Sequence, residues 1–142
     1  MKVKIKKLHP NAVIPQYSKP GDAGMDLVAV NIHIISTDAI DIAQIDSGIA
    51  VEIPEGYVGL IFPRSSVYKN NTLLSNSVGV IDSGYRGSIK ANFLTDVEVF
   101  GYQVGDKFAQ LIILPYPQIE FEEVDELSSS DRGEGGFGST GS

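Results

Sequence analysis

Short stretches rich in Val, Ile, Phe and Tyr follow one another along this chain, and clusters of Gly, Pro, Asp and Asn separate them. Such stretches are typical of β-strands, and the separating residues favour tight turns. The spacing of an amphipathic helix is scarce, so strands must supply almost all of the regular structure. The sequence predicts strands over residues 3–8, 25–30, 32–35, 43–53, 57–62, 88–94, 97–102, 108–114 and 119–124.

Many short strands without intervening helices predict an all-β sandwich, jelly roll or barrel. The 142 residues fit one domain with a core of ordinary size. One short helix is expected near residues 65–71, where Ser65 or Ser66 could cap its first turn. The lysine-rich N-terminus alternates Val3 and Ile5 with lysines, which indicates an edge strand and not a signal peptide.

The charge balance and the absence of cysteine exclude several classes of function. The chain has 18 Asp and Glu against 11 Lys and Arg, for a net charge of −7, so we expect no nucleic-acid partner. Without cysteine there is no thiolate nucleophile or Cys-ligated zinc, and His9 and His33 are interpreted as structural. No apolar run approaches the ~18–20 residues that span a bilayer, so we expect no membrane partner. The absence of a signal peptide and of cysteine favours a cytoplasmic or nucleoplasmic location.

The composition changes after residue 127, so residues 1–127 are expected to form the β domain and residues 128–142 a flexible arm. Residues 132–141 (RGEGGFGSTG) hold five glycines. Such a segment can be a frayed tail, because its backbone entropy is high. Its arginine, aromatic ring and hydroxyls are equally suited to bind a phosphorylated aromatic ligand. The acidic residues at 120–126 are interpreted as a solvated strand face.

All three arginines, Arg64, Arg86 and Arg132, lie in turn-rich segments. Arginine binds oxyanions through two parallel hydrogen bonds, so this placement favours a small anionic ligand, although chance or surface ion pairing gives the same pattern. Arg86 is interpreted as structural because it is close to Asp82. Ser65 and Ser66 follow Arg64 at a strand end, where they could hold a phosphate or only cap a turn.

Asp82 follows the apolar residues 79–81 and enters a tight turn. A carboxylate at such an edge can orient a water as general base, whereas an aspartate entering a turn more often binds backbone amides. Asp26 and Asp106 have the same ambiguity.

Five segments, taken in order, resemble the five motifs of the trimeric dUTPases. They are residues 23–27 (AGMDL), 63–66 (PRSS), 79–87 (GVIDSGYRG), 105–111 (GDKFAQL) and 132–141. The resemblance implies a jelly roll, a homotrimer whose active sites are shared between subunits, and hydrolysis of dUTP to dUMP and pyrophosphate. It also implies Mg²⁺ bound through the triphosphate and waters, with Asp26 near the outer metal shell. Two residues depart from the pattern, Ser66 for a usual glycine and Gly84 for a usual acid, and we expect a modest effect on affinity.

The resemblance assigns each site residue an expected role. Asp82 would activate the attacking water, and Tyr85 would pack on the deoxyribose. The residues expected to contact uracil are Asn76, Gly79, Val80, Ile81 and, through its main chain, Lys90. Those expected to hold the phosphate chain are Arg64, Ser65, Ser66 and Gln110. The arm that closes over the substrate would contribute Arg132, Phe137, Gly138, Ser139 and Thr140.

Two alternatives stay open. A dCTP deaminase resembles this fold but needs a differently equipped base pocket. A nucleotide-binding regulator or jelly-roll structural module would bind without turnover.

Overall fold

The computed structural model describes residues 1–139 and 141. Within them the chain forms ten strands and one 3-10 helix. In chain order they are β1 (Lys4–Lys7), β2 (Met25–Val28), β3 (Asn31–Ser36), β4 (Asp41–Asp46), β5 (Ile49–Glu52), β6 (Tyr57–Pro63), η1 (Val67–Asn70), β7 (Thr72–Leu74), β8 (Gly79–Ile81), β9 (Lys90–Thr95) and β10 (Lys107–Pro115). The prediction of an all-β fold is confirmed.

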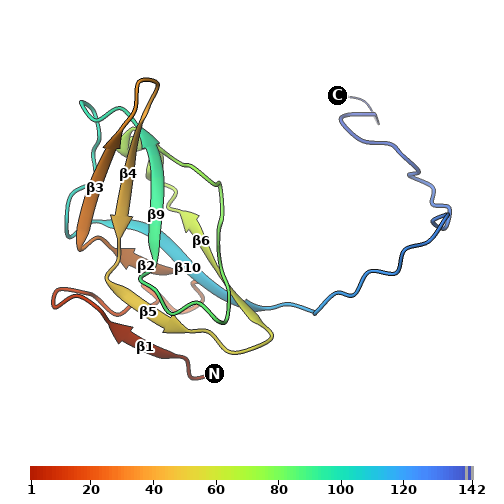
Figure 1. The fold of residues 1–142 in the computed structure, drawn as a ribbon, viewed down its shortest axis with the longest axis horizontal. Coiled ribbons are helices and arrows are strands. Elements are labelled where there is room, and N and C mark those ends of the chain that lie inside the picture. The colour runs from red at the N-terminus through yellow and green to blue at the C-terminus, as the bar shows by residue number, and fades with distance from the viewer. Residues whose placement is uncertain (140, 142) are drawn as a thin grey trace.

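Two four-stranded antiparallel sheets form the body (Figure 1). One has the order β2-β10-β6-β8 and the other the order β3-β4-β9-β7, while β1 and β5 pair as a separate ladder at one end. Neighbours in each sheet are often far apart in sequence, as where β10 runs between β2 and β6. These crossings make the jelly-roll sandwich that the sequence predicts.

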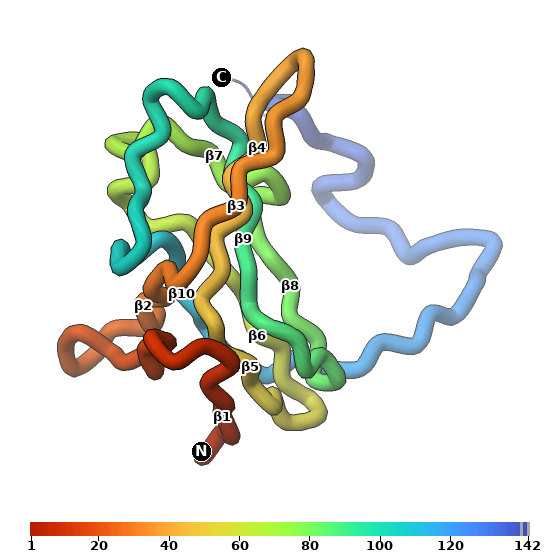
Figure 2. The backbone as a smooth tube through the Cα atoms, turned by 60° about the vertical axis from the view of Figure 1, so that its left-hand side comes forward, coloured from red at the N-terminus to blue at the C-terminus, as the bar shows by residue number. Residues whose placement is uncertain are grey.

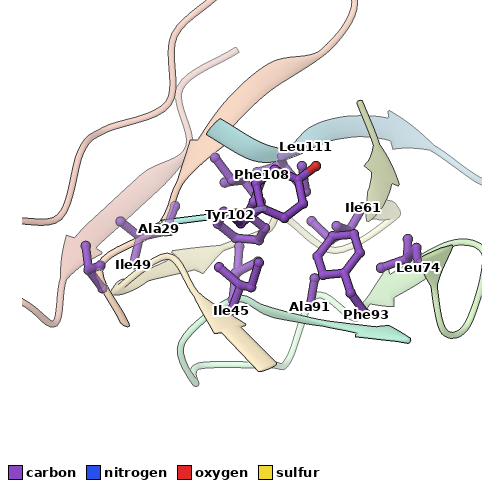
Figure 3. Close-up of a cluster of buried hydrophobic side chains, with 14 of the residues drawn as sticks. Ala29, Ile45, Ile49, Ile61, Leu74, Ala91, Phe93, Tyr102, Phe108 and Leu111 are labelled. Carbon is purple, nitrogen blue, oxygen red and sulfur yellow. The ribbon is translucent and has the colours of Figure 1, made fainter. Parts of the chain in front are cut away.

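The core lies between the two large sheets, where the rings of Phe93, Tyr102 and Phe108 meet (Figure 3). The Phe93 centroid lies 5.6 Å from that of Tyr102 and 6.4 Å from that of Phe108, at an angle near perpendicular to the latter ring. In β9, Ala91 and Phe93 point inward, so the alternation of a strand turns Lys90 and Asn92 outward. This alternation determines which β9 side chains reach the candidate site.

The predicted strand over residues 43–53 is divided by a turn at Ser47 and Gly48 into β4 and β5. Gly48 has φ +66°, and a Cβ there would lie 2.8 Å from both His9 Cβ and Val30 Cγ2. Positive φ and close packing together require glycine, which ends the strand. The buried Ser47 hydroxyl donates to the Ile89 carbonyl at 2.7 Å, which ties this turn to the start of β9.

Three other local predictions need correction. The expected helix near residues 65–71 is a single 3-10 turn, and the Ser66 side chain makes no capping hydrogen bond. Residues 97–102 form no strand: Phe100 and Tyr102 pack against the core from a loop, so their apolar pattern reflects burial alone. Residues 72–74 form β7, which the sequence analysis missed.

Beyond β10 the chain leaves the sandwich and runs away from it (Figure 2). Residues 119–124 form no strand because no neighbouring strand of this chain lies beside them, and Phe121 and Leu127 are almost fully exposed. The acidic residues of this segment are therefore solvated, as predicted, but not on a strand. Among the described residues no helix is long or apolar enough to cross a membrane.

Candidate active site

The loop that joins β7 to β8 forms one wall of the largest group of predicted site residues. The two strands lie in different sheets and do not pair with each other, so this loop crosses between the sheets and is not a β-hairpin. The loop is closed by hydrogen bonds from the Ser77 amide to the Leu74 carbonyl (3.1 Å) and from the Val78 amide to the Asn76 carbonyl (2.6 Å). β8 pairs with β6 through Gly79, Val80 and Ile81 and ends its sheet. An edge strand leaves one row of backbone N–H and C=O groups available to a ligand.

A cleft of about 440 Å³, the β8 cleft, opens beside this loop and strand β8. Six of the predicted site residues line it: Asn76, Gly79, Val80, Ile81, Tyr85 and Lys90. A second cavity, of about 200 Å³, shares Val80, Ile81, Tyr85 and Lys90 with the first and adds Asp82 and Ser88. The fold thus gathers the β8 backbone and Tyr85 around a cleft of the size of a small-ligand site, with Asp82 in the smaller cavity beside it.

The turn after β8 presents Asp82 and Tyr85. The Tyr85 amide donates to the Asp82 carbonyl at 3.1 Å, and Arg86 Nη1 donates to the carbonyls of Ser83 (2.6 Å) and Tyr85 (3.1 Å). Arg86 therefore stabilises the turn, as its position in the sequence indicates. Asp82 itself is exposed at the rim of the smaller cavity.

A second group of predicted residues surrounds Asp26. One carboxylate oxygen of Asp26 lies 2.9 Å from Arg64 Nε, and the other lies 2.9 Å from Lys107 Nζ. Burial alone would raise the pKa of Asp26, but the hydrogen bond from Lys107 and the charge of Arg64 outweigh it and lower the pKa below its usual value. The carboxylate is therefore ionised at neutral pH and fixes the direction of the Arg64 side chain.

Gln110 joins the same group from β10. It stands opposite Asp26 on β2 and Phe62 on β6, and its amide donates to the Pro63 carbonyl at 3.1 Å. Lys107 was not predicted as a site residue, although it belongs to the segment 105–111 that carries the resemblance. Its pairing with Asp26 spans most of the chain, which local sequence patterns do not reveal.

The two groups of residues do not share a cavity within one chain. The Asp26 group is built on β2, β10 and the end of β6, whereas the cleft lies at β8, the opposite edge from β2. Neither the β8 cleft nor the smaller cavity beside it is lined by Arg64, Ser65, Ser66 or Gln110.

The C-terminal arm carries the third group and lies away from the sandwich (Figures 1 and 2). Arg132 Nε donates to the Gly135 carbonyl at 2.9 Å, and the Ser139 amide donates to the Gly136 carbonyl at 3.0 Å. Phe137 is fully exposed, and Gly138 beside it has φ +79°. Thr140 lies outside the described residues.

The protein itself offers no ready-made metal cage in the part of the chain that the structure describes: no cluster of three or more His, Asp or Glu side chains is suitably placed. Both oxygens of Asp26 already face cations.

A two-sheet jelly roll with a polar cleft beside the edge strand β8, and with an arginine-serine loop held by a carboxylate, defines a β-sandwich protein adapted to a small anionic ligand. The dUTPase family model matches residues 10–141. The chain is 44% identical over 147 residues to the deoxyuridine 5'-triphosphate nucleotidohydrolase of Escherichia phage T5, covering 99% of both chains. It is 41% identical over 144 residues to the Thermobifida fusca protein of that name, covering 99% of this chain and 79% of the relative.

Solved structures show the same relationship. A Staphylococcus bacteriophage 80alpha dUTPase with dUpNHpp superimposes with a TM-score of 0.83 at 30% identity, covering 99% of both chains. A dUTPase mutant from phage phi11 of S. aureus, described with a structural Mg(II) ion, superimposes with a TM-score of 0.74 at 27% identity, covering 91% of this chain and 100% of the other. The chain belongs to the dUTPase family.

Proposed function

We propose that this protein hydrolyses dUTP to dUMP and pyrophosphate, with Asp82 as the general base. The observation that carries the proposal is the turn after β8, which sets Asp82 beside Tyr85 at the rim of the smaller cavity, and this cavity shares Tyr85 with the β8 cleft. Family membership and relatives named for this reaction support it.

The edge strand β8 and the loop before it would recognise uracil through their backbone. Gly79, Val80 and Ile81 pair with β6 on one side only, so their free edge and the Asn76 amide can meet the base, with the Lys90 main chain opposite. A narrow site against this backbone would exclude the methyl group of thymine and mismatch the amino group of cytosine. Tyr85 would pack against the deoxyribose and disfavour a 2′-hydroxyl.

In the chemical step, Asp82 takes a proton from a water whose oxygen bonds to the α-phosphorus, and the bond from that phosphorus to the bridging oxygen breaks to release pyrophosphate. Arg64, Ser65, Ser66 and Gln110 would hold the phosphate chain, with Arg64 kept in place by Asp26. Mg²⁺, bound through the triphosphate and waters with Asp26 beyond the water shell, would neutralise phosphate charge.

A homotrimer with shared active sites would bring the separated groups together. Within one chain the Arg64 group and the β8 cleft lie apart, so a complete site needs the Arg64 loop of a second copy. The chain after β10 also exposes the apolar side chains of Ile119, Phe121 and Leu127 to solvent, which is unfavourable for an isolated monomer. Contact with a neighbouring copy would cover these side chains.

Residues 128–142 would act as the flexible arm that closes the site, beyond the β domain of residues 1–127. Arg132, Ser139 and Thr140 would bind the γ-phosphate, and Phe137, with Gly138 beside it, would stack on uracil. The exposure of Phe137 supports this role, because a large exposed ring gains burial only when a partner covers it. Closure would exclude water from the reacting centre.

Incubation of the purified protein with dUTP, dCTP, dTTP or UTP in the presence of Mg²⁺ tests the proposal. Pyrophosphate released from dUTP, and much less from the other three, is the expected result. Ammonia from dCTP would favour the deaminase alternative, and binding without any product would favour a regulator.

A further inference from the structure

Asp46 and Ser47, at the turn between β4 and β5, contact the three consecutive residues 88–90, which lead from the Tyr85 turn into β9. Asp46 Oδ1 accepts hydrogen bonds from the Ser88 hydroxyl and from the Gly48 amide, the latter at 2.8 Å. Asp46 Oδ2 lies 3.5 Å from Lys90 Nζ. The next residue, Ser47, holds the Ile89 carbonyl between them.

Ser88 links this turn to the tyrosine of the cleft. The Tyr85 hydroxyl donates to the Ser88 carbonyl at 3.0 Å. The ring also lies directly over Gly87, where an added Cβ would come within 2.6 Å of Tyr85 Cζ. The position of the Tyr85 ring therefore depends on the backbone of Gly87 and Ser88. Asp46 accepts a hydrogen bond from the Ser88 side chain.

These contacts go beyond what the sheet itself requires. Asp46 already stands opposite Lys90 in the β4–β9 ladder, so the backbone alone joins the two strands. The Asp46 side chain is only 21% exposed and accepts from two donors in addition to facing the Lys90 ammonium group. Both side chains that it holds, Ser88 and Lys90, line the smaller cavity together with Asp82 and Tyr85.

We infer that Asp46 is a positioning residue: it fixes Ser88 and Lys90, and through Ser88 it sets the place of the Tyr85 ring that selects deoxyribose over ribose. The inference rests on the proposed function, since it assigns Asp46 to the same cleft. Asp46 lines neither of the two cavities, so its effect passes through Ser88, which precedes β9 by two residues.

The test is the ratio of kcat/KM for dUTP to kcat/KM for UTP. Asp46→Ala is expected to lower this ratio on the order of tenfold, the effect of losing one hydrogen bond to a charged group. Most of the loss should appear as a higher KM for dUTP, because Asp82 is left in place. Asp46→Asn keeps an oxygen for the Ser88 hydroxyl and should restore most of the ratio.

Asp41→Ala is the matched control. Asp41 begins the same strand and accepts a hydrogen bond from the Val97 amide at 2.9 Å, but it lies at the far end of β4 from this turn. It should lower stability without changing the ratio. If Asp46→Ala does not fold, Ser88→Ala removes the linking hydroxyl alone and should lower the ratio in the same direction.

A double-mutant cycle with Tyr85→Phe identifies the route. Tyr85→Phe removes the hydroxyl that Ser88 holds, so Asp46→Ala should change the ratio less in that background than in the wild type. An unchanged ratio in Asp46→Ala, or strictly additive effects in the cycle, would overturn the inference while a wild type active on dUTP leaves the proposed function standing. A wild type without activity on dUTP would instead overturn the proposed function.

Discussion

Replacing Asp26 by asparagine should destabilise the fold and do so in a pH-dependent way. The Asp26 side chain is 18% exposed, and it faces Arg64 and Lys107, whose side chains are 33% and 49% exposed. Exposed ion pairs contribute at most about 1 kcal/mol, whereas removal of one partner from a buried pair costs ~3–5 kcal/mol. This partly buried group lies between the two, so we expect a loss of about 2 kcal/mol at pH 7.

The pH dependence follows from the direction of the pKa shift. The pKa of Asp26 in the folded protein lies below its ordinary value of 3.8, so the unfolded chain binds the proton more readily. The stabilisation is therefore fully present above the unfolded pKa and is lost as the pH falls through the folded one. Wild type and Asp26→Asn should converge in stability as the pH falls below about 4.

Urea unfolding at a fixed protein concentration, at several pH values between 7 and 3, measures both effects. A loss of about 2 kcal/mol lowers the midpoint at pH 7 by about 1 M for a domain of this size. Asp38→Asn, in the exposed turn between β3 and β4, removes the same charge and should change the midpoint little. A difference below about 0.5 kcal/mol at pH 7, or one that persists unchanged at pH 3, would refute the reasoning.

Three further predictions address the arm, the assembly and the core. Deletion of residues 132–142 should abolish most turnover in a pyrophosphate-release assay without lowering the urea midpoint, and full activity would contradict the closing role of the arm. Co-assembly of inactive Arg64→Ala and Asp82→Asn chains should restore part of the activity, because a shared site takes each residue from a different copy; no recovery would place both in one chain. Tyr102→Phe should change the free energy of unfolding by no more than about 1 kcal/mol, because the buried Tyr102 hydroxyl has only weak polar contacts, from Asn70 and Thr72, and a larger shift of the urea midpoint would contradict this.

The sequence predicts the strands well where local pattern and burial agree. β6 and β10 are continuous apolar runs within the sandwich, and their predicted ranges differ by only a residue or so from those observed. The pattern fails at residues 97–102, because a loop here packs Phe100 against the core and buries Tyr102 without forming a strand. The strand prediction over residues 43–53 also fails at Gly48, where the need for glycine arises from His9 and Val30, which are distant in sequence.

The candidate site divides in the same way. Asp82, Tyr85 and the β8 residues lie close together in sequence, so their grouping around two adjoining cavities follows from a local motif. The pairing of Asp26 with Arg64 and Lys107, and that of Asp46 with Ser88 and Lys90, depend on which strands become neighbours. Contacts of this kind are determined by sheet topology, which residue spacing does not encode.

Hydrolysis of dUTP in ¹⁸O-labelled water by the wild type and by Asp82→Asn tests the central claim most directly. The account predicts that the wild type releases pyrophosphate and places the label in dUMP, whereas Asp82→Asn still binds dUTP but releases almost none. Label in pyrophosphate would contradict attack at the α-phosphorus, and near-normal release by Asp82→Asn would contradict the role of Asp82 as the general base.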